Sequence, residues 1–169
     1  HAMIAPSTFC DVDGSYRGAD GQAHENPGYQ TYTTFSLWDT YRAAMPLYSI
    51  FQSERYTDMI NTMLSIYKEQ DKLPVWHLHG CETNCMVGNP GIIPVADAIV
   101  KDLPGIDYEL AFGAMKASAL RPDRGQEHRM KYGYIPCDLM NESVAYDLEY
   151  ALADGALANA AKVLGKEDD

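Results

Sequence analysis

Apolar side chains recur at helical intervals along several stretches of the chain. The clearest stretch follows Ser53, which is a predicted N-cap, and its apolar stripe at three- and four-residue intervals reaches Tyr67. An earlier stretch begins at Thr34 and continues until Pro46 perturbs the backbone. The pattern therefore predicts one helix over 34–45 and a second of about five turns from Ser53.

A longer helix is predicted near the end of the sequence. Asn141, Glu142 and Ser143 open it, and Gly165 follows its last apolar position, where glycine is typical after a helix. Shorter helices are expected at about 92–102 and 107–119.

Three other stretches have the residue types that are typical of loops. Residues 5–33 are rich in Gly, Asp, Pro, Tyr and Thr and show neither the helical nor the strand period. Residues 73–90 and 120–141 are punctuated by glycine and proline. Because long loops in compact domains are usually functional, and because the first loop is aromatic, we predict that residues 1–33 form an irregular loop that builds a site.

No strand pattern competes with these helices, so the predicted fold class is mainly α. Residues 34–169 are expected to form helical hairpins joined alternately by short links and long loops. This alternation suits a toroid of hairpins with the long loops, and therefore the site, on one rim.

Composition narrows the function classes. The chain has 169 residues, enough for one domain with a sizeable core. Its formal charge of -11 repels phosphate backbones, so a nucleic-acid partner is not expected. No apolar run approaches the roughly 20 residues that a membrane-spanning helix needs, so a membrane span is not expected.

The loop over residues 11–21 resembles a calcium-binding EF-hand loop only superficially. Counting from Asp11 places Tyr16 where glycine is needed and Gln22 where a bidentate glutamate is needed. Counting from Asp13 places His24 at that last position. The loop is therefore predicted to form turns, or to present polar side chains to a ligand.

Two imidazoles and two thiols fall within nine residues, at His77, His79, Cys81 and Cys85. Four such ligands could form a zinc site, but one short run is sterically tight for a tetrahedral ion. A disulfide between Cys81 and Cys85, or free thiols, are the alternatives. The four cysteines of the chain allow three pairings that the sequence does not separate.

Trp38 and Asp39 are adjacent on a predicted helical turn. An indole face packs on the C–H surface of a sugar while a neighbouring carboxylate accepts from its hydroxyls, so this pair suits carbohydrate binding. A core tryptophan beside a solvated aspartate is the alternative. Glu82 and Glu142 are weak candidates for a catalytic carboxylate pair. No Ser-His-Asp order, P-loop or Gly-x-Gly-x-x-Gly pattern is present.

Five segments together resemble glycoside hydrolase family 92, the calcium-dependent exo-acting α-mannosidases. They occur in the family's order: DVDGSYRGADG at 11–21, FSLWDTYRAA at 35–44, LPVWHLHGCET at 73–83, AMKASA at 114–119 and GYIP at 133–136. The resemblance covers nearly the whole chain.

The resemblance implies an enzyme with an N-terminal β-sandwich followed by an (α/α)6 toroid. Residues 1–169 are then expected to be a fragment of the toroid, with the sandwich and the C-terminal part of the toroid outside it. The family cleaves α-mannosides with inversion, so it needs one carboxylic acid to protonate the leaving oxygen and one carboxylate to activate water. A calcium ion that contacts sugar hydroxyls is the implied cofactor, with ligands expected outside this chain.

The resemblance also assigns site residues. The family's general acid and base lie in Glu-Gly-Asn-Ala-Trp and Gly-Asn-Asp-Asp motifs, neither of which occurs here, so no catalytic residue is expected in this chain and it alone should be inactive. Trp38 and Asp39 match residues that hold the terminal mannose. Trp76, Cys81 and Glu82 lie in a motif associated with the wall of the site.

The resulting hypothesis is part of an inverting, calcium-dependent exo-α-mannosidase, of the α-1,2 type, that acts on mannose-rich glycans. The complete protein is expected to be periplasmic or extracellular. The alternative hypothesis is a non-catalytic helical carbohydrate-binding or interaction domain stapled by a metal in its His/Cys loop.

Overall fold

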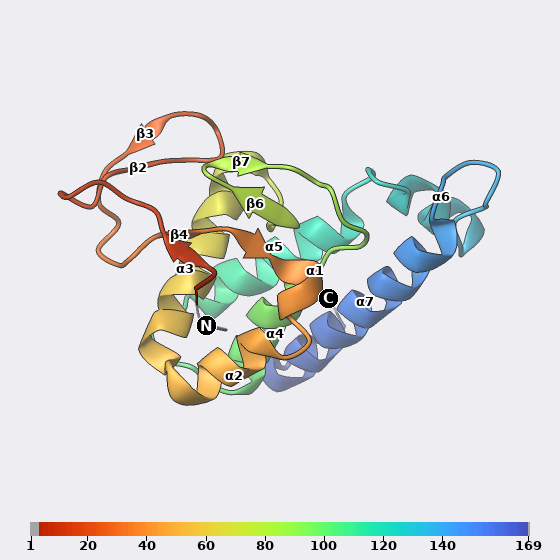
Figure 1. The fold of residues 1–169 in the computed structure, drawn as a ribbon. Helices are drawn as coiled ribbons and strands as arrows, with labels where there is room; N and C mark the ends of the chain where they lie inside the picture. The colour runs from red at the N-terminus through yellow and green to blue at the C-terminus, as the bar shows by residue number, and fades with distance from the viewer. Residues whose placement is uncertain (1–3, 169) are drawn as a thin grey trace.

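A computed structural model describes residues 4–168 and shows a mainly helical chain, as the periodicity predicts (Figure 1). Residues 1–3 of the expected first loop lie outside the described residues. The helices are α1 (Leu37–Thr40), α2 (Ala44–Phe51), α3 (Ser53–Gln70), α4 (Ile92–Val100), α5 (Tyr108–Leu120), α6 (Gln126–Tyr132) and α7 (Ser143–Leu164).

The longer helices pack on one another in a connected group. α4 lies against α7 and α5, and α3 packs on α2, α4 and α5. A short link over 101–107 joins α4 to α5, whereas long segments precede α4 and α7. In Figure 1, β2, β3, β6, β7 and α6 lie in the upper part of the molecule, above α2 and α4.

Short strands lie within the long segments. β1 (Ser7–Thr8) pairs with β4 (Tyr32–Thr33), and β2 (Tyr16–Arg17) pairs with β3 (Ala23–His24), both antiparallel. A three-stranded antiparallel sheet has the order β5 (Phe35–Ser36), β6 (Trp76–Leu78) and β7 (Cys81–Glu82). The first loop is thus an ordered, paired segment over its described residues.

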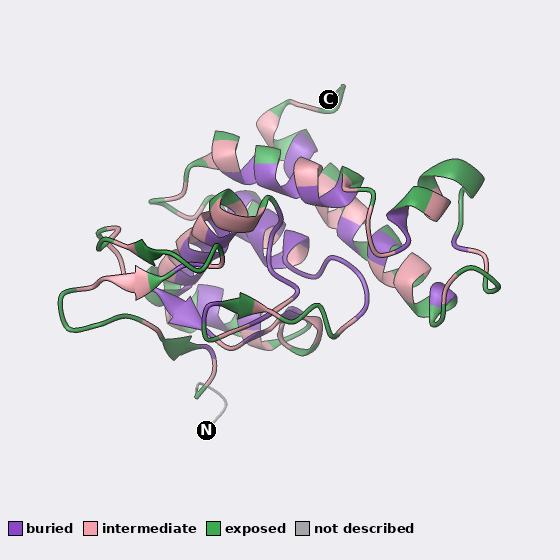
Figure 2. Ribbon diagram, turned by 90° about the horizontal axis from the view of Figure 1, so that it is seen from above, coloured by how far each residue is buried: buried purple, intermediate pink, exposed green. Residues whose placement is uncertain are grey.

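The core lies where the helices face each other and the β5–β6 ladder (Figure 2). It is rich in aromatic and β-branched side chains and in methionine, which adapts to irregular gaps. Its largest fully buried members include Tyr48, Tyr56, Tyr150, Phe35, Leu37, Met45, Ile60, Met63, Ile92, Ile99 and Met115. Because Phe35 and Leu37 flank Ser36, the core fixes the segment that leads to Trp38 and Asp39.

The single helix predicted over 34–45 is wrong. Thr34 has a φ of 64°, β5 follows it, and α1 ends at Thr40 before a turn leads to α2. The pairing of Phe35 with His77 and of Ser36 with Trp76 outweighs the local helical spacing. Pro46 lies in the first turn of α2, where a missing N–H costs little, so it does not end a helix.

Two smaller predictions also fail. Gln52 rather than Ser53 occupies the N-cap of α3, because Gln52 also ends α2 and leaves no room for an earlier turn. The connection over 120–141 contains α6, whose ends are set by Gly125 and Gly133 in left-handed conformation. The glycines that indicated a loop are therefore helix caps.

The last helix is confirmed. α7 ends at Gly165, whose φ of 66° is the left-handed conformation that glycine adopts most easily. Its outward face exposes the large apolar side chains of Val144, Leu148, Leu152 and Val163. Within the described residues, none of the helices combines the length and apolar character needed to traverse a bilayer.

Candidate functional site

The small sheet brings two of the sequence motifs together. β5 carries the start of segment 35–44, and β6 and β7 carry segment 73–83. Ser36 lies opposite Trp76 in the ladder, so the turn that bears Trp38 and Asp39 begins beside Trp76. The β5–β6 pairing thus brings these two separate segments together.

Asp39 is exposed on the first turn of α1. The Ser36 hydroxyl donates to its Oδ2 at 2.6 Å, which fixes the carboxylate, and no hydrogen bond within residues 4–168 reaches Oδ1. An ionised carboxylate has several acceptor positions, so Oδ1 can still accept from a ligand hydroxyl. A carboxylate that is held in place but not fully used is suited to binding.

Trp38 is partly buried beside Asp39. Its indole Nε1 is buried and has no hydrogen-bond partner among the described residues. The guanidinium carbon of Arg42 lies 5.2 Å from the Trp38 ring centroid and 4.6 Å from that of Tyr41. One face of the indole is therefore covered by a cation, which is a favourable arrangement for a tryptophan ring.

Glu149 of α7 holds both residues that follow this turn. Arg42 Nη2 lies 2.5 Å from Glu149 Oε1, and the Tyr41 hydroxyl donates to Oε2 at 2.9 Å. Burial raises the pKa of Tyr41 to about 12, and its hydrogen bond to the Glu149 carboxylate acts in the same direction. The phenol therefore remains a donor at neutral pH.

Glu82 uses its carboxylate inside the protein. Oε1 accepts from the backbone N–H of Trp76 at 2.9 Å and of Asn84 at 2.8 Å, and Oε2 accepts from Val75 at 2.7 Å. Charge-assisted hydrogen bonds of this kind are stronger than neutral ones. Glu82 therefore fixes the backbone that carries Trp76, and its bonds within the chain occupy both of its oxygens.

Cys81 lies across the hairpin turn from Leu78 and is exposed. With Glu82 and Lys72 it lines a polar pocket of about 410 Å³, whereas Trp38, Asp39 and Trp76 do not line this pocket. The predicted residues thus divide into two groups. Trp76 lies beside the Trp38 turn, and Cys81 and Glu82 face a neighbouring hollow.

The metal-stapled loop of the alternative hypothesis is wrong for the described residues. His77 is buried, 3% exposed, whereas Cys81 and Cys85 are exposed, and all four cysteines are free. No group of three or more His, Cys, Asp and Glu side chains within residues 4–168 gathers closely enough to hold a metal ion. A Cys81–Cys85 disulfide is also absent there.

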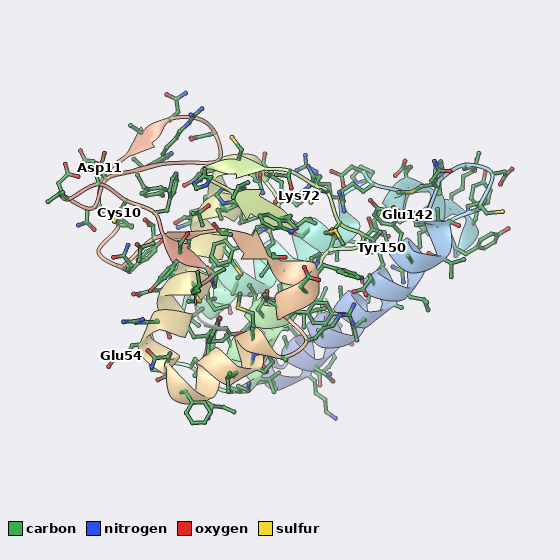
Figure 3. The ribbon with its side chains drawn as sticks, viewed as in Figure 1. Cys10, Asp11, Glu54, Lys72, Glu142 and Tyr150 are labelled. Carbon is green, nitrogen blue, oxygen red and sulfur yellow. The ribbon has the colours of Figure 1, made fainter. Side chains whose placement is uncertain are left out.

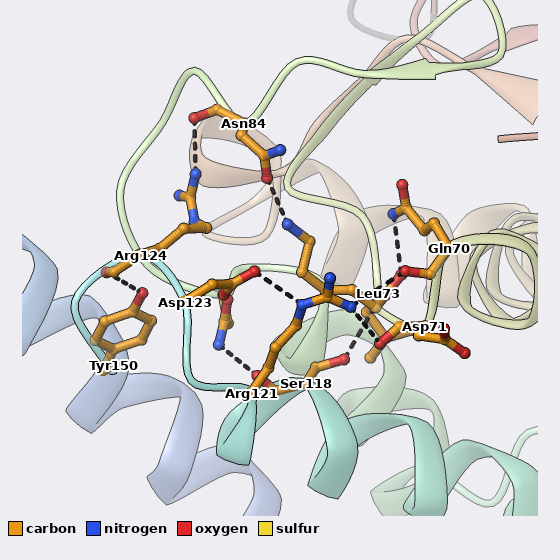
Figure 4. A network of polar contacts seen from close by, with 11 residues as sticks. Gln70, Asp71, Leu73, Asn84, Ser118, Arg121, Asp123, Arg124 and Tyr150 are labelled. Carbon is orange, nitrogen blue, oxygen red and sulfur yellow. Dashed lines mark hydrogen bonds and ion pairs between the residues drawn. The ribbon is translucent and has the colours of Figure 1, made fainter. Parts of the chain in front are cut away.

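A network that sequence reasoning missed connects the loop before α4 to the loop after α5 (Figure 4). The Lys72 ammonium donates to Asn84 Oδ1 at 2.5 Å, and burial lowers the pKa of Lys72. Arg124 donates to the Asn84 carbonyl at 2.8 Å and to the Met86 carbonyl. These contacts hold the end of the 73–83 segment in place. No sequence signal identifies them, because 40 residues separate Asn84 from Arg124.

The remaining motifs have structural roles. Glu69 near the end of α3 accepts from the Tyr16 hydroxyl at 2.8 Å and from the Ala19 N–H at 2.6 Å, which docks the β2–β3 hairpin. Ser118 of α5 accepts from the Leu73 N–H at 2.9 Å and so anchors the start of segment 73–83. Glu142, at the N-cap of α7, does not line the pocket that Glu82 and Lys72 share, and Figure 3 shows Glu142 apart from Lys72.

An indole next to a fixed carboxylate on a short helical turn is an arrangement that suits a carbohydrate-active domain. The chain belongs to glycosyl hydrolase family 92: the model of that family's catalytic domain matches residues 1–169. This confirms the family resemblance of the five segments.

Solved structures agree with this assignment. A family GH92 α-mannosidase from Bacteroides thetaiotaomicron, solved alone and in complex with mannoimidazole, is 43% identical with a TM-score of 0.96. In the complex, the match covers 99% of this chain and 22% of that one. A family GH92 inverting mannosidase from the same organism is 30% identical with a TM-score of 0.88, over 99% of this chain and 24% of its own.

A curated relative in Arthroderma benhamiae is described as an uncharacterized secreted glycosidase. It is 30% identical over 146 residues, which are 76% of this chain and 19% of the relative. The chain therefore spans about a fifth of the length of the relatives that it matches.

Proposed function

We propose that residues 1–169 form part of the toroid of an inverting, calcium-dependent exo-α-mannosidase, of the α-1,2 type, that trims mannose-rich glycans outside the cytoplasm. Family membership supports the glycosidase chemistry, and the name of the 30% identical relative supports inversion. The description of the fungal relative as secreted supports the location. The hairpin arrangement of α3, α4, α5 and α7 fits a partial (α/α)6 toroid.

The observation that carries the proposal is the geometry at Asp39. One of its carboxylate oxygens is fixed by Ser36, no hydrogen bond among the described residues reaches the other, and Asp39 is the exposed residue that follows Trp38 in α1. In this proposal the indole packs on the C–H face of the terminal mannose and Asp39 accepts from its hydroxyls. Both interactions orient the sugar, and neither transfers a proton in the reaction.

The chemical step requires groups from the rest of the enzyme. An inverting mechanism needs two carboxyl groups about 6.5–9.5 Å apart, one to protonate the leaving oxygen and one to activate water. Glu82 does not fit either role, since three backbone N–H groups bind it. The general acid and base are therefore assigned to other parts of the protein, as the missing motifs also indicate.

Calcium is likewise assigned to residues outside this chain. Ca²⁺ takes six to eight oxygen ligands, and carboxylates are usually among them. The described residues do not gather the His, Cys, Asp or Glu cluster that would supply such ligands. The donor set between Ile4 and Asp168 therefore does not fit the ion, and we derive no step through it.

The test is to express the longer reading frame that contains this chain and to assay mannose release from α-1,2-mannobiose. We expect hydrolysis that a chelator abolishes and calcium restores, with β-mannose as the first product detected by NMR. Residues 1–169 alone should be inactive. Release of α-mannose, hydrolysis by the 169-residue chain, or sugar binding without any hydrolysis by the complete protein would each contradict the proposal.

Asp39→Asn in the complete enzyme tests the site residue. Losing a charged acceptor for sugar hydroxyls should lower kcat/KM by about ten- to a hundredfold, since a hydrogen bond to a charged group contributes about 1.5–3 kcal/mol. Asp11→Asn is the control, because Asp11 is also an exposed aspartate but lies in the 11–21 loop and not on α1. Equal activity of both variants would exclude Asp39 from the site.

A further inference from the structure

Glu149 is connected to Trp38 through two intermediates, although 111 positions separate them in the sequence. One carboxylate oxygen pairs with Arg42, and the other accepts from Tyr41. Arg42 in turn lies over the rings of both Trp38 and Tyr41. The carboxylate therefore holds the guanidinium and the phenol that together define the surroundings of the indole.

The two ends of the Arg42–Glu149 pair differ in exposure. The Arg42 side chain is 46% exposed and the Glu149 side chain only 14%. An exposed arginine on its own samples many rotamers, since its side-chain entropy is high. Glu149 is less free, because it extends from the 22-residue helix α7 and its Cβ lies against the backbone at Gly88. The rigid partner is thus the glutamate, and it restricts the arginine.

The Arg42–Glu149 pair affects one face of the Trp38 indole. An indole has two faces, and the tethered guanidinium covers one of them at 5.2 Å from the centroid. A cation on one face stabilises the ring position, and more strongly when it is desolvated. Without the Glu149 anchor, Arg42 would leave this position, and the ring would lose the contact that fixes its orientation.

We propose that Glu149 is a positioning residue for the sugar-binding indole of Trp38, acting through Arg42 and Tyr41. The proposal rests on the proposed function, in which the other face of Trp38 packs on the terminal mannose. A ligand platform must be held in one orientation to bind without additional entropy cost. Glu149 touches neither sugar nor reacting atoms, so it affects binding and not the chemical step.

The test compares Glu149→Gln with Asp154→Asn in the complete enzyme. Asp154 is a matched control, since it also lies on α7 and also binds an arginine, Arg129, at 2.6 Å, but Arg129 lies over the ring of Tyr150 and not over that of Trp38. We expect Glu149→Gln to raise KM for a mannoside about tenfold with kcat within about twofold, as loss of uniform binding predicts. Asp154→Asn should leave both constants unchanged.

A second measurement reports on the indole without any substrate. The complete protein is labelled with 5-fluorotryptophan, and the Trp38 and Trp76 resonances are assigned from the Trp38→Phe and Trp76→Phe variants. Glu149→Gln should move or broaden the Trp38 resonance and leave that of Trp76 in place. Arg42→Met should reproduce the change, because Arg42 transmits the effect.

The two measurements distinguish failure of the Glu149 proposal from failure of the proposed function. An unchanged Trp38 resonance in a folded Glu149→Gln variant would overturn the proposal. A changed resonance with an unchanged KM would also overturn it, because Glu149 would then hold an indole that does not bind the sugar. If the unmodified enzyme neither binds nor cleaves mannosides, the proposed function fails, and the resonance alone then decides whether Glu149 holds Trp38.

Discussion

Gly88 lies directly against Glu149: a methyl group added at Gly88 would be 2.5 Å from the Glu149 Cβ. No pair of carbon side-chain atoms approaches so closely, so the loop before α4 and the helix α7 meet here without any space for a side chain. Gly88 also has a φ of 75°, which disfavours other residues. Both the close contact with Glu149 and the positive φ therefore require glycine at position 88.

Gly88→Ala should consequently destabilise the protein by about 3–5 kcal/mol, from backbone strain plus displacement of Glu149. The control is Gly28→Ala, because Gly28 has a similar φ of 87° but no atom within 4 Å of an added methyl. That variant should lose only about 1–2 kcal/mol. Urea denaturation measures both, and equal losses would show that the contact with Glu149 is not tight.

Glu82 provides a second stability prediction. Glu82→Gln keeps one acceptor oxygen and places an amide N–H₂ opposite backbone donors at Val75 or at Trp76 and Asn84. A loss of about 1–3 kcal/mol in the free energy of unfolding is expected, because a part-buried backbone donor at Val75 or Trp76 is left unpaired. The exposed Glu25→Gln variant should change it by less than about 0.5 kcal/mol. A similarly small loss for Glu82→Gln would contradict the anchoring role.

The parts of the fold that sequence predicts well are those fixed by local periodicity. The helices α3 and α7 carry long amphipathic patterns, and Gly165 marks the end of α7. The short α6 has the sequence QEHRMKY, which offers no apolar stripe, so only its tertiary setting shows it to be a helix. The residues before α1 are predicted wrongly because β6, 40 residues later, pairs with them.

The candidate site also has features that a local motif predicts and features that depend on residues far apart in the sequence. Trp38 and Asp39 are adjacent in sequence, so their chemistry is visible in one motif. Glu82 also lies in a motif, but its role in binding the backbone depends on how the hairpin folds back on Val75 and Trp76. The Arg42–Glu149 pair spans 107 positions, and no pattern in a single sequence connects two such distant charges.

His77 makes stability depend on pH. It is 3% exposed, and neither of its ring nitrogens has a partner among the described residues. Burial lowers its pKa, the nearby Glu82 carboxylate opposes this shift, and His79 adds to it. Because the folded state disfavours the imidazolium, the unfolded state binds more protons below about pH 6.5, where an ordinary histidine titrates. The stability contributed by neutral His77 is therefore complete above that pH and is lost as the pH falls toward the lowered pKa.

The measurement is the free energy of unfolding between pH 7.5 and pH 5, compared with that of His77→Leu. We expect the difference between the two proteins to move in favour of the variant as the pH falls, by about 1.4 kcal/mol for each unit of pKa depression. Replacing the exposed His79 with Asn, which tolerates its φ of 49°, should retain most of the pH dependence, because burial is the largest cause of the lowered pKa of His77. A constant difference for His77→Leu would show that His77 is not held neutral by burial.

The exposed thiols provide a test of the metal-stapled loop. Cys10, Cys81, Cys85 and Cys137 are all free and exposed, and the buried His77 cannot reach the same ion as Cys81 and Cys85 without unfolding β6. A thiol reagent should therefore react with four cysteines of the reduced native chain, and saturating zinc should protect none of them. Cys10 and Cys137, which lie outside the loop, serve as the internal control. Zinc-dependent protection of Cys81 and Cys85 alone would restore the stapled loop, whereas equal reactivity of the four leaves the hydrogen bonds of Glu82 as the contacts that fix this segment.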